Sequence, residues 1–336
     1  MSTARDRPAS VLLANGRVLV AGGYGAGNSV NKSAELYNPA SKQWNSTGSM
    51  QTGRTGDFLI LLDNGKVLAL GGTPELYDAA AGTWSATTAP PVAVGVGSHT
   101  LLADGRVLAI PDGGANALIY DPGNASWTNV GGFDGRVRFA ATLLDDGRVL
   151  ISGGCMSGCA TQKLATTLLY DPDTNHWSSA GNMHFARYEH LSNILPDGRV
   201  VVSHGVVDSS GADISSEVFD PGTGTWALAG NVIKESPYTR GASGTVLKDG
   251  RVLVAGGAES SMSTGILDNP QQGALNQTNA EVFSESGMKW DRATAPGTGL
   301  KQPRYYHTAV RLPDGSVLIA GGSDSRPLSA AEVFHP

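Results

Sequence analysis

The chain repeats one pattern of polar and apolar positions seven times, and this pattern predicts its secondary structure. Each copy has a polar turn that contains glycine, then a short apolar run, and most copies end in a pair of glycines. The turn glycines lie 40 to 65 residues apart and are Gly16, Gly65, Gly105, Gly147, Gly198, Gly250 and Gly315. A self-similar period of this length indicates a radial or stacked repeat, in which each copy is one supersecondary unit.

The copy around Gly198 predicts four short strands, which we name A to D in chain order. They are strand A at 187–195, strand B at Val200–Ser203, strand C at Glu217–Pro221 and strand D opening at Trp226. Asp197-Gly198 is predicted to be a two-residue hairpin turn between A and B, because glycine tolerates the positive φ that such turns need. Four antiparallel strands in a meander make one blade of a β-propeller.

Tryptophans and glycine pairs follow the same register in the other copies. The six tryptophans are Trp44, Trp84, Trp127, Trp177, Trp226 and Trp290. Large aromatic side chains bury much apolar area, so we assign them to packing between blades. The paired glycines after strand B allow backbones to approach closely where blades converge. Both features are scaffold, so function is sought where the repeat is broken.

The order Asp-Gly-Arg-Val-Leu-Val-x-Gly-Gly, then Ala-Glu-Val-Phe/Tyr-Asp-Pro, then Trp, resembles the kelch repeat over essentially the whole chain. The resemblance implies an all-β, seven-bladed kelch-type propeller of four-stranded antiparallel blades, with residues 1–336 as a single domain. The register lacks the outermost strand of the last blade between Pro336 and Met1. We therefore predict that the termini are neighbours, and either that this blade has three strands or that the sequence is part of a longer protein.

Composition narrows the classes of partner. A net charge of −6 with 16% charged residues does not resemble a basic nucleic-acid-binding surface. Apolar runs of about seven residues are too short to span a membrane. No signal peptide is recognisable at the polar N-terminus. The resemblance to kelch chains with Asp-Gly turns implies an exported bacterial protein, and the low lysine content agrees with an extracellular or cell-surface location. We predict a monomer with no cofactor and no bound metal.

Cys155 and Cys159 are the only cysteines and lie in the sequence Cys-Met-Ser-Gly-Cys. Their spacing allows a small disulfide loop, two free thiols, or half of a zinc site, although no histidine pair with finger spacing accompanies them. A disulfide would agree with an exported protein.

The resemblance implies that the loops joining strands B to C and D to A project from one face, the loop face. Its B–C loops differ in length, the longest covering residues 258–279, and long loops on a rigid scaffold usually carry binding function. Strand A starts on the same face. Eleven residues before the turn glycine, five of seven copies have arginine, which we interpret as scaffold that pairs with backbone or acidic groups.

Eight to ten residues before the turn glycine, the residue type differs from one copy of the repeat to the next. These positions are therefore better candidates for a specific site than the recurring arginine. The candidates for catalysis are Tyr188, Glu189, His190, Tyr306 and His307. The candidates for ligand binding at and near these positions are Asp57, Arg138, Arg187, His204, Tyr238, Arg240, Arg304 and Tyr305. Such side chains, converging from different blades, can bind anionic or polyhydroxylated ligands. Ordinary packing or solvation is the competing interpretation for each of them.

Part of this set resembles the copper radical oxidases of the galactose oxidase type. Arg304-Tyr305-Tyr306-His307 resembles that family's Tyr-His copper motif, and Tyr188 resembles its cross-linked tyrosine. The preceding strand A, 136–144, has no cysteine to form the cross-link. The second copper histidine of that family comes from a C-terminal domain outside this sequence. These departures make alcohol oxidation the weakest of three interpretations.

The leading interpretation is a propeller that binds a protein, a glycan or a polar small molecule at the loop face and at the axial mouth, where the strand-A ends converge. The alternative is a non-redox isomerase, lyase or cyclase in which Glu189 transfers protons together with Tyr188 and His190. A deep pocket holding Glu189, His190 and His307 within hydrogen-bond reach would favour the enzyme, and a shallow rim would favour the binder.

Overall fold

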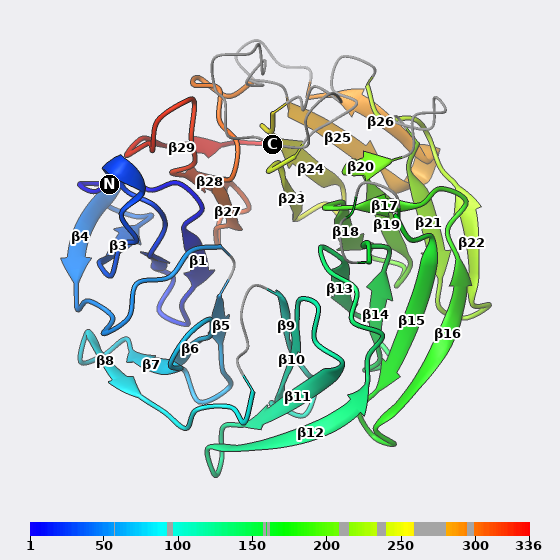
Figure 1. The fold of residues 1–336 in the computed structure, drawn as a ribbon. Coiled ribbons are helices and arrows are strands. Elements are labelled where there is room, and N and C mark those ends of the chain that lie inside the picture. The colour runs from blue at the N-terminus through cyan, green and yellow to red at the C-terminus, as the bar shows by residue number, and fades with distance from the viewer. Residues whose placement is uncertain are drawn as a thin grey trace. The chain divides into compact units, whose positions relative to one another are not determined.

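The computed structural model confirms the predicted fold class. It describes residues 1–56, 58–92, 97–156, 159, 162–207, 215–233, 240–258, 280–293 and 299–336. Within these ranges the chain is a seven-bladed β-propeller of mostly four-stranded antiparallel sheets (Figure 1). No helix in the described part of the chain has the length and apolar character needed to cross a membrane.

The chain divides into two compact units, and the first comprises Met1–Gly135 and His307–His335. It contains blades 1, 2, 3 and 7. Blade 1 is β1 (Ala9–Leu12), β2 (Val18–Ala21), β3 (Ala34–Asn38) and β4 (Gln43–Thr47), with the short 3-10 turn η1 (Ala26–Asn28) between β2 and β3. Blade 2 is β5 (Leu59–Leu61), β6 (Val67–Ala69), β7 (Glu75–Asp78) and β8 (Thr83–Ala86). Blade 3 is β9 (Gly97–Leu101), β10 (Val107–Pro111), β11 (Asn116–Asp121) and β12 (Ser126–Gly132). Blade 7 is β27 (Thr308–Arg311), β28 (Val317–Ala320) and β29 (Ala331–Phe334).

The second unit comprises Arg136–Tyr306 and Pro336, and it contains blades 4, 5 and 6. Blade 4 is β13 (Ala140–Leu143), β14 (Val149–Ser152), β15 (Thr166–Asp171) and β16 (His176–Asn182). Blade 5 is β18 (Leu191–Ile194), β19 (Val200–Ser203), β21 (Glu217–Asp220) and β22 (Thr225–Leu228), with a two-stranded ribbon of β17 (Arg187–Tyr188) and β20 (Val206–Val207). Blade 6 is β23 (Ser243–Val246), β24 (Val252–Ala255), β25 (Ala280–Ser284) and β26 (Lys289–Arg292), with the 3-10 turn η2 (Glu285–Gly287) before β26.

The turn between the first two strands of each blade holds three residues, so the prediction of a two-residue turn is wrong. In blade 5 the amide of Gly198 donates to the carbonyl of Leu195 at 3.0 Å, and the amide of Leu195 donates to the carbonyl of Arg199 at 2.7 Å. Gly198 has φ of +83°. This is a type I turn followed by a left-handed glycine, and it demands glycine as strongly as the two-residue turn does.

Glycine pairs join consecutive blades, as the sequence predicts. In blade 4 the amide of Gly154 donates to the carbonyl of Arg187 in blade 5 at 2.8 Å. A Cβ placed on Gly153 would lie 2.4 Å from that same carbonyl oxygen, a distance that no side chain tolerates. Blade 1 meets blade 2 in the same way, because the amide of Gly23 donates to the carbonyl of Arg54 at 2.8 Å.

The arginines eleven residues before the turn glycines are buried, each at most 3% exposed: Arg5, Arg54, Arg136, Arg187 and Arg304. Arg187 donates to Ser215 and pairs with Glu217 at 3.2 Å. Arg5 pairs in the same way with Glu35 in blade 1. This agrees with the interpretation of these arginines as scaffold.

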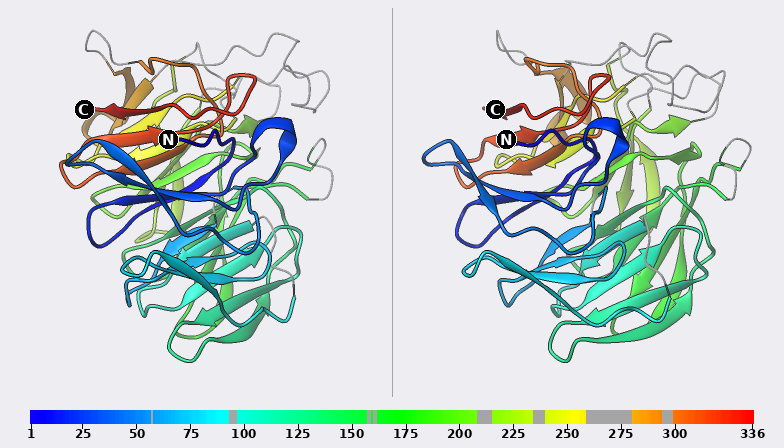
Figure 2. Two further views of the ribbon diagram at one scale, coloured as in Figure 1. Left: turned by 90° about the vertical axis from the view of Figure 1, so that its left-hand side faces the viewer. Right: turned by 60° about the vertical axis from the view of Figure 1, so that its left-hand side comes forward.

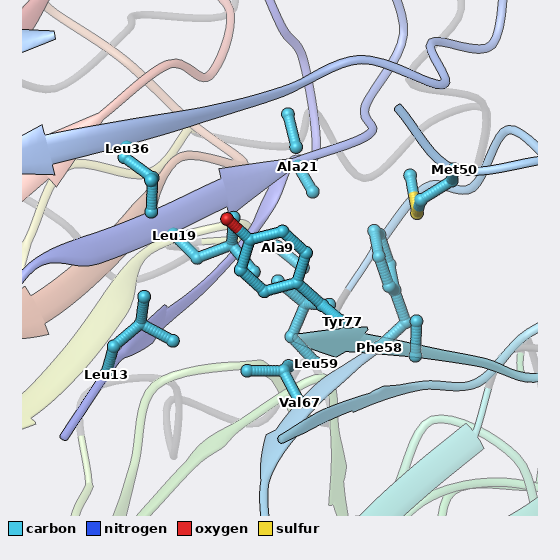
Figure 3. Close-up of a cluster of buried hydrophobic side chains, with 12 residues drawn as sticks. Ala9, Leu13, Leu19, Ala21, Leu36, Met50, Phe58, Leu59, Val67 and Tyr77 are labelled. Atoms are coloured by element: carbon cyan, nitrogen blue, oxygen red, sulfur yellow. The ribbon is translucent and has the colours of Figure 1, made fainter. Parts of the chain in front are cut away.

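Aromatic pairs and apolar side chains fill the space between blades. Each tryptophan lies opposite a tyrosine or phenylalanine of the neighbouring strand, with ring centroids 4.8 to 5.2 Å apart. Several indole N–H groups reach the preceding blade, as Trp84 does in donating to the carbonyl of Gly48 at 2.9 Å. Figure 3 shows Leu19 of blade 1 meeting Phe58 and Tyr77 of blade 2 in one buried cluster. The tryptophans therefore have the packing role that was predicted.

Blade 7 has three strands in the described residues, and the N-terminal segment lies beside its last strand (Figure 2). The amino group of Met1 donates to the carbonyl of Ser329 at 3.1 Å, and Arg5 forms a β-bridge with Leu328. Three strands in this sequence agree with both alternatives, a three-stranded blade and a part of a longer protein. Met1 packs with Leu312 and Leu318 against blade 1.

Candidate ligand-binding site

One position of the repeat has a left-handed backbone in each blade that the structure describes there. It lies nine residues before the turn glycine, and its φ values are +52° for Arg7, +87° for Gly56, +56° for Arg138, +52° for Glu189, +68° for Gly241 and +51° for Tyr306. Glycine adopts this conformation without strain, whereas a residue with a Cβ does so at a cost of about 1–2 kcal/mol. Four blades therefore carry a side chain where the backbone favours glycine.

Backbone hydrogen bonds link these left-handed residues from one blade to the next. The amide of Glu189 donates to the carbonyl of Arg138 at 2.9 Å, and the amide of Tyr306 donates to the carbonyl of Gly241 at 2.7 Å. The left-handed turn at Glu189 also divides the predicted strand 187–195 into β17 and β18, so the prediction of one continuous strand is wrong. Side chains at these positions stand on a fixed backbone.

In the second unit, three of the predicted residues form an ion-pair network. The Arg240 guanidinium binds the Glu189 carboxylate through two hydrogen bonds, Nε to Oε2 at 2.5 Å and Nη2 to Oε1 at 2.7 Å. Arg138 of the preceding blade reaches the same carboxylate, with Nη1 2.9 Å from Oε1. The side chains differ in exposure: 9% for Arg240, 22% for Glu189 and 42% for Arg138. Glu189 therefore joins a buried arginine to an exposed one.

Three tyrosines complete this group. The guanidinium carbon of Arg138 lies 5.7 Å from the ring centroid of Tyr188, a cation–π distance. The rings of Tyr305 and Tyr306 meet edge to face at 5.4 Å. A Cβ on Gly241 would lie 2.7 Å from the Tyr306 ring, so the absence of a side chain there lets this ring pack on the backbone. We call Arg138, Tyr188, Glu189, Arg240, Tyr305 and Tyr306 the arginine–tyrosine cluster.

Electrostatics in the cluster keep Arg240 charged. Burial lowers the pKa of the Arg240 guanidinium, but hydrogen bonds and attraction from Glu189, with smaller contributions from Tyr306 and Tyr188, raise that pKa above its ordinary value. A bidentate arginine–carboxylate pair of this kind also fixes geometry. Arg240 thus holds the Glu189 carboxylate in place.

Two predicted histidines lie buried beside the cluster. His190 Nε2 lies 2.7 Å from the hydroxyl of Ser152, and His204 Nδ1 lies 2.9 Å from the hydroxyl of Ser203. The His204 ring also meets Trp290 edge to face. Burial first, and then the charge of nearby Arg187, lowers the pKa of each histidine to about 3. Both imidazoles are therefore neutral at ordinary pH.

The other predicted residues are either buried or outside the described residues. Arg187 and Arg304 are buried at 1% exposure, so neither guanidinium is accessible to a ligand at the surface. His307 is buried and belongs to the first unit. Asp57, Tyr238 and the loop at 259–279 lie outside the described residues.

Sequence reasoning missed one feature beside the cluster and left a second one open. Gly241 was not a candidate, although a glycine at the left-handed position is a readable signal in the aligned repeats. The disulfide between Cys155 and Cys159 was one of three open alternatives, and the structure forms it. Cys155 pairs with Val137 through two backbone hydrogen bonds, so this loop supports the residue that precedes Arg138.

The donor set does not fit a copper radical centre. Both cysteines of the chain are joined in the disulfide, so neither is available for a thioether to Tyr188. The guanidinium of Arg138 lies over the Tyr188 ring, and Arg240 is close enough to be stabilised by Tyr188 and Tyr306. The guanidinium groups beside these tyrosines have no lone pair to offer a metal cation.

Comparisons with known proteins agree with the repeat pattern. A model of the Kelch motif matches residues 7–51 and 136–184. Two galactose oxidase sequences from Gibberella zeae are 23% and 24% identical to the chain over 293 residues. The match covers 81% of this chain but only 36% of each galactose oxidase.

A solved structure has the same fold. It is a fungal alcohol oxidase of the AA5 family in complex with copper, with a TM-score of 0.75 and 17% sequence identity. The match covers 99% of this chain and 74% of that one. The chain is thus a Kelch-motif β-propeller with distant similarity to galactose oxidase and the AA5 alcohol oxidase.

Proposed function

We propose that this propeller is a binding protein that recognises a glycan at the arginine–tyrosine cluster. The observation that carries the proposal is the Arg138 guanidinium, which is 42% exposed, lies over the Tyr188 ring and is held by Glu189. A guanidinium beside aromatic side chains suits a polyhydroxylated ligand. The aromatic rings can cover the apolar face of a sugar ring, while the guanidinium donates hydrogen bonds to the sugar oxygens. The fixed backbone beneath them limits the entropy lost on binding.

The state of Glu189 favours binding over acid–base catalysis. A general base needs a carboxylate oxygen within reach of the substrate proton. Both oxygens of Glu189 accept hydrogen bonds from Arg240, and Oε1 also meets Arg138. His190, the second candidate base, is buried and bonded to Ser152. Neither group is presented to a ligand as a proton acceptor, so the isomerase, lyase or cyclase alternative receives less support.

A glycan microarray with the purified protein tests the proposal. We expect binding to a defined set of glycans, and we expect Tyr188→Ala to weaken it at least tenfold by removing the aromatic surface under Arg138. Tyr24→Ala is the matched control, since Tyr24 is a half-buried tyrosine of the first unit that pairs with Asp6 and Val30. Absence of any bound glycan, or equal losses in the two variants, would refute the proposal, and a protein partner would then be sought.

A further inference from the structure

We infer that the Cys155–Cys159 disulfide is a redox switch for ligand binding at the arginine–tyrosine cluster; this inference rests on the proposed function. The disulfide lies in the B–C loop of blade 4 and joins residues four positions apart. Both cysteines lie outside β14 and β15, so reduction acts on the loop rather than on the blade. This loop supports the two backbone segments that carry Arg138 and Tyr188.

The backbone of Cys155 supports the segment that carries Arg138. The amide of Val137 donates to the carbonyl of Cys155 at 2.8 Å, and the amide of Cys155 donates to the carbonyl of Val137 at 2.9 Å. Val137 directly precedes Arg138 in the chain. A displacement of Cys155 is therefore transmitted to the backbone from which the exposed guanidinium projects.

The same loop holds the segment that carries Tyr188. The amide of Gly154 donates to the carbonyl of Arg187 at 2.8 Å, and the amide of Arg187 donates to the carbonyl of Leu164 at 3.1 Å. Gly154 and Leu164 are themselves joined by a 2.9 Å hydrogen bond, donated by the amide of Leu164. Because Arg187 directly precedes Tyr188, one loop positions both partners of the cation–π contact.

Blade 1 has the same backbone arrangement without a disulfide. There the amide of Gly23 donates to the carbonyl of Arg54, the amide of Arg54 to the carbonyl of Asn31, and the amide of Asn31 to the carbonyl of Gly23. Tyr24 stands where blade 4 has Cys155. The fold therefore does not require a covalent bond at this place, and the disulfide gives the loop of blade 4 a property that the equivalent loop lacks.

Burial of the two cysteines decides which sulfur a reductant reaches. Cys155 is fully buried, whereas Cys159 is half-buried and has φ of +29°, a left-handed conformation that is strained for a residue with a Cβ. A thiolate of an external dithiol attacks the sulfur of Cys159 to form a mixed disulfide, and Cys155 leaves as a thiolate that takes a proton. The second thiol of the dithiol then releases Cys159, so the dithiol is oxidised to a disulfide while the protein gains two electrons and two protons. Opening the loop allows Cys159 to leave its strained conformation.

Amide hydrogen exchange tests the coupling without any ligand. The oxidised protein is compared with the protein reduced by dithiothreitol and with the double variant Cys155→Ala, Cys159→Ala, which cannot form the disulfide. We expect the amides of Val137 and Arg187 to exchange about ten times faster in the reduced protein and in the variant. The amide of Arg54, which is equivalent to Arg187, should exchange at the same rate in all three and so report that the propeller stays folded.

The glycan microarray, repeated with the same three proteins, tests the effect on binding. We expect the signal of each bound glycan to fall about threefold on reduction and in the variant, because the binding surface is less preorganised. Oxidised glutathione should restore the signal only in the unmodified protein. Unchanged exchange at Val137 and Arg187, or glycan signals that do not fall on reduction, would overturn this inference while glycan binding stands. If the oxidised protein binds no glycan, the proposed function itself fails.

Discussion

Arg7 of blade 1 and Arg138 of blade 4 occupy the same position of the repeat, with φ of +52° and +56°. Both side chains are exposed, and the carbonyl of each accepts a 2.9 Å hydrogen bond from the equivalent residue of the next blade. For Arg7 that residue is Gly56, which brings no side chain, and for Arg138 it is Glu189, which brings a carboxylate. The repeat determines where a side chain stands, and the following blade determines what chemistry it meets.

Beneath this position the two blades remain alike. Each has a buried arginine two residues earlier, Arg5 in blade 1 and Arg136 in blade 4. Arg5 donates to the carbonyl of Gly22 at 2.8 Å, and Arg136 donates to the carbonyl of Gly153 at 2.9 Å. The buried arginines thus form a layer that repeats between blades, whereas the left-handed residues two positions later form a layer that varies. The two layers should respond differently to mutation.

The largest effect is expected in the repeating layer. Arg187→Ala removes the guanidinium that pairs with Glu217, whose side chain is fully buried. Leaving a buried charge without its partner costs about 3–5 kcal/mol, so the free energy of unfolding should fall by that amount in urea denaturation. Arg199→Ala is the control in the same blade, because Arg199 and its partner Asp197 are about one-third exposed. It should cost less than about 1 kcal/mol. Equal losses would show that burial does not separate the two layers.

A pH effect of intermediate size is expected from His190 and His204. Their pKa values are lowered to about 3 in the folded protein, whereas the unfolded chain titrates near 6.5. Between these values the unfolded state binds protons that the folded state does not. Stability is therefore complete above pH ~6.5 and falls by about 1.4 kcal/mol per pH unit for each histidine as pH falls toward 3.

Urea denaturation of two variants between pH 7 and pH 4 isolates the contribution of a buried histidine to the pH dependence of stability. His190→Gln should have a stability that depends less on pH, by about 1.4 kcal/mol for each unit below 6.5. Exposed His176→Gln should follow the unmodified protein. If His190→Gln instead retains the full slope, the buried imidazole is not the group responsible.

The sequence predicted the repeating layer far better than the variable one. Turn glycines, tryptophans and buried arginines recur at constant spacing, so counting residues was enough to assign them to the scaffold. Counting also gathered Arg138, Tyr188, Glu189, Arg240 and Tyr306 as candidates, and the structure brings these five together.

The spacing of residues in the repeat did not reveal the direction in which each side chain points. Glu189 was proposed as a proton-transfer group, but the left-handed backbone turns it between two arginines of the adjacent blades. His190, one residue later, points into the interior instead and meets Ser152. Neighbours in sequence thus diverge in space at a backbone feature that periodicity alone does not reveal.

The smallest effect on stability is expected when the two left-handed arginines, Arg7 and Arg138, are each replaced by glycine. Arg7→Gly removes the left-handed strain of about 1–2 kcal/mol but adds an entropic cost of about 0.5–1 kcal/mol. It should therefore stabilise the protein by up to about 1.5 kcal/mol. Arg138→Gly gains the same amount and also loses the pair with Glu189, which is worth up to about 1 kcal/mol at this exposure. Its net change should be close to zero.

The difference between these two variants, measured by parallel urea denaturation, is the contribution of the cluster contact, because the backbone terms cancel. Combining each with Glu189→Gln should abolish the difference. If both glycine variants are instead less stable than the unmodified protein by more than about 1 kcal/mol, the left-handed arginines are supporting the fold. Backbone strain at this position would then not mark Arg138 as a ligand-binding residue.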